Sequence, residues 1–119
     1  MLSLQSKLQY IGKAFNDALP GLVFHYWRPN NFPYCVWQEE SEADSLWSDN
    51  TKTEQAISCT ADYYTKTEYD TNIDLLQDVL NNISSAWRIE AVQYEEDTKL
   101  IHYTFAFEVR EVNEILESV

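Results

Sequence analysis

The chain has 119 residues, of which 45% are hydrophobic and 14% aromatic, too many for a disordered protein and enough for a folded core. Eight Lys and Arg stand against twenty Asp and Glu, and the formal charge of −12 leaves too few cations for ordinary binding along duplex DNA. The two glycines are too few for a Gly-rich phosphate-binding loop, which excludes the enzymes that depend on one.

The first predicted element is an amphipathic helix that must end at Pro20-Gly21. Its apolar residues recur at steps of four and three: Leu4, Leu8, Ile11, Phe15 and Leu19. Aromatic and β-branched residues then predict strands over 22–27 and 33–38. Turn-forming residues at 28–31 lie between them, so we expect these two strands to pair as an antiparallel hairpin.

The segment 39–50 is acidic, has no Lys or Arg, and is predicted to be a long polar loop. From Glu54 an alternating pattern predicts a third strand, with Ile57, Cys59, Ala61 and Tyr63 on one face. A second helix follows, capped by Asp70 or Thr71 and ending near Ser84-Ser85. Its apolar stripe consists of Ile73, Leu76, Leu80 and Ile83.

Two further strands are predicted over 87–94 and 100–109, joined by a turn at 95–99. The last strand places His102, Thr104 and Glu108 on its polar face, and on its apolar face Ile101, Tyr103, Phe105, Phe107 and Val109. The order α-β-β-β-α-β-β predicts an α+β two-layer sandwich, in which a mainly antiparallel sheet carries both helices on one face. The side chains expected to point inward are Leu8, Ile11, Phe15, Ile57, Leu76, Leu80, Phe105 and Phe107. Residues 1–109 are expected to form one domain, and 110–119 an acidic tail or a short helix.

No stretch approaches the length of apolar chain that spans a bilayer, and the N-terminal residues lack the pattern of a secretory signal. We therefore expect neither a membrane span nor secretion through a signal peptide. Cys35 and Cys59 lie in apolar runs and are expected to be buried free thiols, with a disulfide or a reactive thiol as the less favoured alternatives.

The sequence holds no pattern typical of a catalytic or metal site. His25 and His102 are the only imidazoles, and neither has the ligand spacing of a metal centre. The paired carboxylates are those expected of an acidic chain, and neither cysteine has a nearby base to activate it. We therefore expect no catalytic residue, no cofactor and no metal.

Four Trp and eight Tyr exceed what one small core requires, and aromatic residues are enriched at protein interfaces. Trp27 and Trp37 are expected in the core or as cover for the sheet. Trp47 in the acidic loop either packs locally or anchors a partner. The candidate interface residues are Leu46, Trp47, Asp49 and Asn50.

Four segments, 31–37, 45–50, 61–66 and 94–103, resemble small proteins encoded in the tail modules of Gram-positive prophages, and the similarity extends from about 22 to 109. Together with the order of elements, the chain resembles the tail-terminator, or tail-completion, family of long-tailed bacteriophages. The resemblance implies a structural protein that forms a ring, typically of six copies, and caps the finished tail tube. The implied partners are the tail tube protein and a head-completion protein, with no sequence-specific nucleic-acid binding and no membrane. The implied location is the bacterial host cytoplasm during assembly and then the virion tail.

The charge is compatible with more than one function. In a ring, an acidic lumen would repel DNA and let it pass, whereas in an acidic inhibitor that mimics DNA the same charge would be the binding surface. A generic sheet-based adaptor between proteins is a third alternative, and solubility alone also accounts for the charge.

Overall fold

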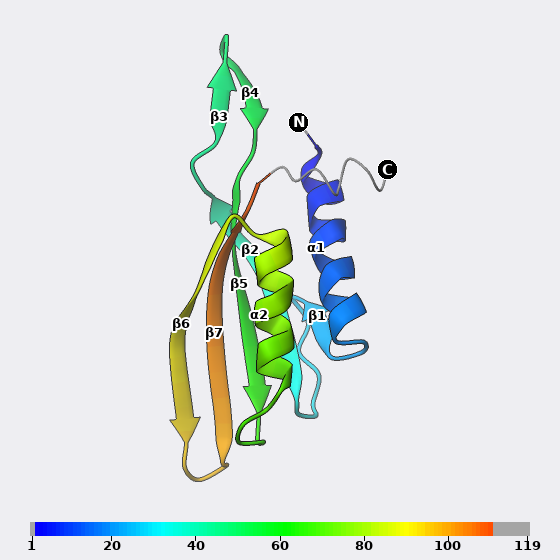
Figure 1. Ribbon diagram of the computed structural model, residues 1–119, viewed down its shortest axis with the longest axis vertical. Helices are drawn as coiled ribbons and strands as arrows, with labels where there is room; N and C mark the ends of the chain where they lie inside the picture. The colour runs from blue at the N-terminus through cyan, green and yellow to red at the C-terminus, as the bar shows by residue number, and fades with distance from the viewer. Residues whose placement is uncertain (1, 111–119) are drawn as a thin grey trace.

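The computed structural model describes residues 2–110, which form a five-stranded sheet, two helices on one face of it, and a separate two-stranded hairpin (Figure 1). In chain order the elements are α1 (Leu4–Ala18), β1 (Val23–His25), β2 (Tyr34–Glu42), β3 (Leu46–Ser48), β4 (Thr51–Glu54), β5 (Ile57–Thr65), α2 (Asn72–Ile83), β6 (Ala86–Glu95) and β7 (Leu100–Val109).

Both helices begin and end where the sequence predicts. Ser3 caps α1, because its hydroxyl accepts a hydrogen bond of 3.1 Å from the Ser6 amide. At α2 the residue in the cap position is Thr71, but the side chain that caps is Asp70, whose Oδ1 accepts from the Asn72 amide at 2.9 Å. Each helix therefore starts with a side-chain acceptor for one of its unpaired backbone donors.

The sheet has the strand order β1-β2-β5-β7-β6, and all of its pairs except β1·β2 are antiparallel. β5 lies at its centre and alternates between buried and half-buried residues along its length. The core lies between the sheet and the helices, and all eight side chains predicted to point inward are buried there. The predicted α+β class, with both helices on one face, is confirmed.

The predicted antiparallel hairpin of the first two strands is wrong, because β1 runs parallel to β2. Val23 is opposite Cys35, and the backbone bonds from Cys35 N to Leu22 O and from Tyr26 N to Trp37 O measure 2.8 and 3.1 Å. β1 leaves the C-terminal end of α1 after a short turn, so the position of that helix sets its direction. Turn-forming residues predict that the chain bends, but they do not determine the length of the connection before the next strand pairs.

The segment 39–50 is not the predicted loop. β2 continues to Glu42 past a bulge, and β3 and β4 form an antiparallel hairpin. Its turn consists of Asp49 and Asn50, with φ of 50° and 64°. Positive φ at two central residues is typical of tight hairpin turns, and Asp and Asn tolerate it better than most residues.

Trp37 is buried as predicted, whereas Trp27 is 61% exposed and makes an edge-to-face contact with Phe24, with ring centroids 4.9 Å apart. Trp27 lies after the end of β1, where the chain has already left the sheet. β6 extends one residue further at each end than predicted, and β7 has the predicted bounds. The acidic tail or short helix predicted for 110–119 lies outside the described residues except for Arg110.

Candidate subunit or partner interface

The β3–β4 hairpin projects beyond the sheet at one end of the molecule (Figure 1). It brings together the four residues predicted as an interface, Leu46 and Trp47 on β3 and Asp49 and Asn50 in the turn. Leu46 is 56% exposed and Trp47 63%, so Trp47 does not fill a core position. Its ring is instead covered on one side by Lys52, whose Nζ lies 5.3 Å from the ring centroid.

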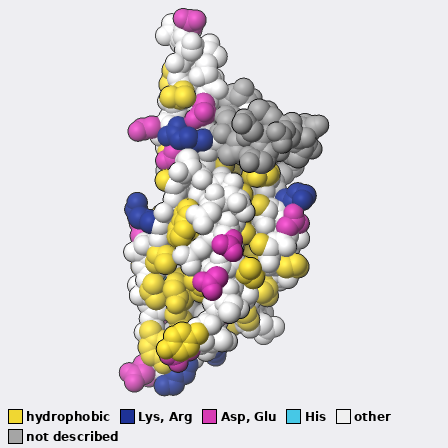
Figure 2. Space-filling model, viewed as in Figure 1, with side chains coloured by type: hydrophobic (Ala, Val, Ile, Leu, Met, Phe, Trp, Pro, Cys, Tyr) yellow, Lys and Arg dark blue, Asp and Glu magenta, His cyan; other side chains and the backbone are white. Residues whose placement is uncertain are grey.

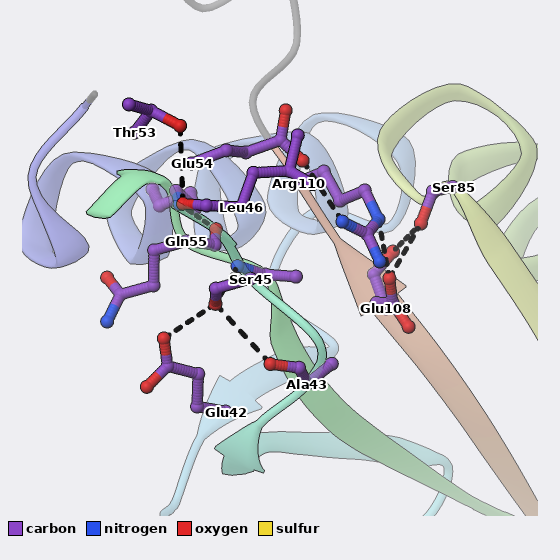
Figure 3. A network of polar contacts seen from close by, with 12 residues as sticks. Glu42, Ala43, Ser45, Leu46, Thr53, Glu54, Gln55, Ser85, Glu108 and Arg110 are labelled. Atoms are coloured by element: carbon purple, nitrogen blue, oxygen red, sulfur yellow. Dashed lines mark hydrogen bonds and ion pairs between the residues drawn. The ribbon is translucent and has the colours of Figure 1, made fainter. Parts of the chain in front are cut away.

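Hydrogen bonds at the base of the hairpin fix where the hairpin leaves the sheet (Figure 3). The Ser45 hydroxyl donates to Glu42 Oε2 at 2.6 Å and accepts from the Ala56 amide at 3.2 Å. Lys52 forms an ion pair with the same Glu42 carboxylate. The hydrogen bonds from Lys52 and Ser45 lower the pKa of Glu42.

Two longer-range contacts tie this base to the body of the protein. Arg110, after β7, donates through Nη1 to Glu54 at 3.0 Å and through Nε to Glu108 at 2.7 Å (Figure 3). The fully buried Lys7 of α1 donates from Nζ to the Gln55 carbonyl oxygen. The base of the hairpin is therefore held from α1 and from β7, while its tip is exposed.

A second exposed surface lies on the helix side of β6, and we call it the apolar strip. It consists of three residues of β6 that are 42% to 59% exposed, Ile89, Val92 and Tyr94. Ile89 pairs with the buried Phe105, Val92 with Tyr103 and Tyr94 with Ile101, so the strip continues the core face of the sheet beyond the cover of α2. In Figure 2 hydrophobic side chains gather over the lower part of this region.

The lower end of the apolar strip opens into a cleft of about 540 Å³, which we call the lysine cleft. It is lined by Lys66, Glu68, Tyr94, Lys99 and Ile101. Neither the strip nor the cleft is predicted by the sequence patterns. Val92 and Tyr94 alternate with polar residues, which is the sequence signal of an apolar face on β6. The bulge between Ile89 and Ala91 breaks this alternation in the first half of the strand.

The sheet face opposite the helices carries the polar residues of β5 and β7. His102 Nε2 lies 2.7 Å from Asp62 Oδ1, which also accepts from the Thr104 hydroxyl at 2.9 Å. Tyr64 stacks on His102, with ring centroids 4.2 Å apart, and accepts a hydrogen bond of 2.8 Å from Arg28. This group satisfies its own hydrogen bonds, and His102 and Thr104 lie on the polar face as predicted.

The other histidine belongs to a separate cluster at the β1 edge. His25 Nε2 lies 2.8 Å from Glu39 Oε1, and the imidazole stacks on the buried Trp37 with centroids 3.9 Å apart. Burial opposes ionisation of Glu39, but hydrogen bonds from Tyr26 and His25 outweigh it and lower the Glu39 pKa. The same contact with Glu39 raises the pKa of Tyr26 to about 12.

Cys35 and Cys59 are free, buried thiols, as predicted. Burial raises the pKa of both, that of Cys59 to about 12, so neither thiol is activated as a nucleophile. Within residues 2–110 no group of three or more His, Cys, Asp or Glu side chains is placed to hold a metal ion. The same part of the chain has no helix with the length and apolar character needed to cross a bilayer.

No family model and no curated protein matches this chain. Among solved structures, it is similar to a chain of the virion of a native gene transfer agent particle. The TM-score is 0.58 at 15% sequence identity, over 91% of this chain and 93% of that one. The two chains share a fold. At 15% sequence identity, the similarity consists of the path of the backbone and the order of the helices and strands.

Proposed function

We propose that this chain is a structural subunit of a virion and acts as a tail terminator. Copies of it would form a ring on the end of the tail tube, stop tube growth and offer a face to a head-completion protein. The observation that carries this proposal is the fold shared with a chain of a gene transfer agent virion over nearly the full length of both chains. The resemblance of the sequence to tail-terminator proteins supports the more specific role.

The exposed surfaces of the chain suit assembly better than catalysis. A ring requires that one surface of each subunit meets a different surface of the next. The hairpin around Trp47 offers one such surface, and the apolar strip on β6 offers another. By contrast, the groups with catalytic potential are engaged within the fold: His102 with Asp62, His25 with Glu39, and the two cysteines in the core. The proposed role is therefore non-enzymatic.

The net charge of −12 also suits a ring through which DNA passes. Every copy adds negative charge, so DNA in the lumen would be repelled by the wall and not held by it. The proposed partners are accordingly other copies of the chain, the tail tube protein and a head-completion protein, and not a specific DNA sequence.

The alternative of an acidic DNA mimic receives less support from the positions of the carboxylates. A mimic needs free carboxylates in a regular array, whereas several acids of this chain are hydrogen-bonded within the fold. These are Glu39, Glu42, Glu54, Asp62 and Asp70. A surface built from carboxylates that hold the protein's own donors is poorly suited to imitate a phosphate backbone.

The test is to delete the coding sequence in the host that makes the particles and to measure the tails by electron microscopy. We expect tails of irregular length that fail to join heads, and restoration by a plasmid copy of the wild type. A copy carrying Arg88→Ala, which alters an exposed ion pair on β6, serves as the matched control and should restore the tails equally. Uniform tails of normal length joined to heads in the deletion strain would refute the proposal, and tight, salt-sensitive binding to a DNA-processing enzyme would favour the mimic.

A further inference from the structure

We infer that the hairpin tip of one copy docks in the lysine cleft of the next copy, with Asp49 between Lys66 and Lys99 and Trp47 against Tyr94 and the apolar strip. This inference rests on the proposed function, because it specifies the contact between successive subunits of the ring.

The two surfaces lie too far apart to meet within one chain. The molecule is 56 Å long, and in Figure 1 the β3–β4 hairpin stands at the top while the β6–β7 turn and the loop between β5 and α2 lie at the bottom. The base of the hairpin is held by Arg110 and Lys7, so the hairpin cannot fold back along the sheet. The occupant of the cleft is therefore the hairpin of a second copy, in a contact of the head-to-tail kind that closed rings require.

The positions of the Lys and Arg side chains distinguish the lysine cleft from the rest of the surface. Within residues 2–110, ion pairs with carboxylates of the same chain engage Lys13, Lys52, Arg88 and Arg110. Lys7 donates to a carbonyl and Arg28 to Tyr64. Lys66 has a ring contact with Phe32, and in residues 2–110 neither it nor Lys99 has a carboxylate partner. Lys66 and Lys99, which form no ion pair within residues 2–110, thus line the same cleft.

Asp49 is the complementary group. It lies at the outermost turn of the hairpin, and among the described residues it forms no ion pair. On a chain of net charge −12, most of the surface of a second copy would repel this carboxylate. The lysine cleft is where it would be attracted, since the cleft is lined by two lysines and one carboxylate, that of Glu68.

The apolar groups beside these charges match as well. Leu46 and Trp47 are exposed next to the tip, while Tyr94 and Ile101 line the cleft and Val92 continues the apolar strip beyond it. The cleft has a volume of about 540 Å³, and pockets that bind ligands usually have volumes of roughly 300 to 1,000 Å³. The cleft can therefore admit an aromatic side chain. A buried tryptophan with a charged pair beside it is typical of the residues that dominate interface energies.

The test reverses the two charges separately and together. D49K and K99E should each weaken self-association at least about tenfold in sedimentation velocity, since like charges placed opposite each other in an interface oppose binding. The double variant D49K/K99E has the net charge of the wild type and should associate within about threefold of it. D49K is diagnostic because it reduces the overall repulsion between copies and yet should weaken association.

The matched controls change the same charges elsewhere. D78K on the exposed face of α2 and K13E on α1 alter the net charge as D49K and K99E do, and neither should weaken association more than about twofold. Thermal melts followed by circular dichroism verify that each variant is folded. If D49K and K99E associate as the wild type does, or if the double variant is no better than the single ones, the docking is wrong.

A complementation arm separates this inference from the proposed function. In the deletion strain the single variants should leave tails of irregular length and the double variant should restore them. If the wild type restores the tails and both single variants do so too, the terminator role stands and the docking fails. If deletion leaves the tails normal, the terminator role fails, while self-association in solution still decides whether the hairpin and the cleft bind.

A free wild type that is monomeric at all salt concentrations leaves the decision to complementation. A chain truncated after Arg110 should associate as the wild type does. Loss of association on truncation would assign the cleft to residues 111–119 instead of the hairpin and overturn the docking.

Discussion

Arg110, the residue after β7, forms an ion pair with Glu54 at the end of β4, with 3.0 Å between Nη1 and Oε1. The same guanidinium holds Glu108 of β7 at 2.7 Å, so one side chain connects the central sheet to the projecting hairpin. This connection is one of several contacts that hold the base of the hairpin.

Replacing Arg110 with Ala should loosen the hairpin without unfolding the protein. We expect amide hydrogen exchange over Thr51–Glu54 to accelerate about twofold to fivefold, as is usual for the loss of a partly exposed ion pair. Hydrogen–deuterium exchange mass spectrometry measures this directly. Arg88→Ala, which removes an ion pair within β6, is the control and should leave exchange in the hairpin unchanged. Equal exchange in Arg110→Ala and in the wild type would mean that the other base contacts suffice.

Phe105 should be among the residues whose truncation costs most stability. It is fully buried on the core face of β7, between Trp87 and Tyr103, with ring centroids 6.3 and 6.4 Å away. Phe105→Ala should lower the free energy of unfolding by about 3 to 5 kcal/mol in urea melts. Ile89→Ala is the control, since Ile89 pairs directly with Phe105 yet is exposed, and it should cost about 1 kcal/mol or less. A loss below about 1 kcal/mol for Phe105→Ala would contradict the assigned core.

Asp70 should make the protein sensitive to acid. Its Oδ2 accepts hydrogen bonds from Tyr63 at 2.6 Å and Thr65 at 2.7 Å, which join β5 to the start of α2. Burial opposes ionisation, but these bonds and the Asn72 amide outweigh it and lower the Asp70 pKa below its ordinary value of 3.8. A lowered pKa stabilises the folded state above the unfolded pKa, and this stabilisation is lost as the pH falls through the folded one.

Asp70→Asn should therefore cost about 1 to 3 kcal/mol at pH 7, because Tyr63 and Thr65 lose a charged acceptor, and the difference from the wild type should shrink toward pH 3. Chemical denaturation at several pH values measures it. Asp78→Asn on the exposed face of α2 should change stability by less than about 0.5 kcal/mol at every pH. A constant difference between Asp70→Asn and the wild type from pH 7 to 3 would show that the Asp70 charge is not involved.

Trp47→Ala should weaken assembly while leaving the melting temperature of the monomer unchanged, because the side chain is exposed on the hairpin. Association of the wild type should strengthen as salt rises, since the screening length falls from about 10 Å at 0.1 M to about 3 Å at 1 M. Salt screens both the repulsion between copies of charge −12 and the attraction within one local ion pair. The repulsion is the larger of the two, so it sets the direction of the salt dependence. Sedimentation velocity across a salt series tests both statements, with Trp27→Ala, an exposed tryptophan outside the hairpin, as control. Association that weakens with salt, or that is equally sensitive to both substitutions, would contradict them.

The elements that the sequence determined by itself are those with a local repeat. The stripes of α1 and α2 and the alternation along β5 and β7 predicted both helices, the inward-facing set and the α+β class, because burial on one side imposes a period of 3.6 or 2 on neighbouring residues. The candidate interface residues lie together on one hairpin, although their segment was expected to be a loop, and their role in an interface stays a prediction: Leu46, Trp47, Asp49 and Asn50.

The tertiary structure alone decided what depends on distant parts of the chain. The parallel direction of β1 follows from the position of α1, and the hydrogen bonds of His102 with Asp62 and of Arg110 with Glu54 join residues 40 and 56 positions apart. The apolar strip and the lysine cleft exist because α2 covers only part of the sheet and because two separate turns meet at one end of it. None of these has a local period, since direction, pairing and exposure are set by which elements pack together and not by the residues next to one another in sequence.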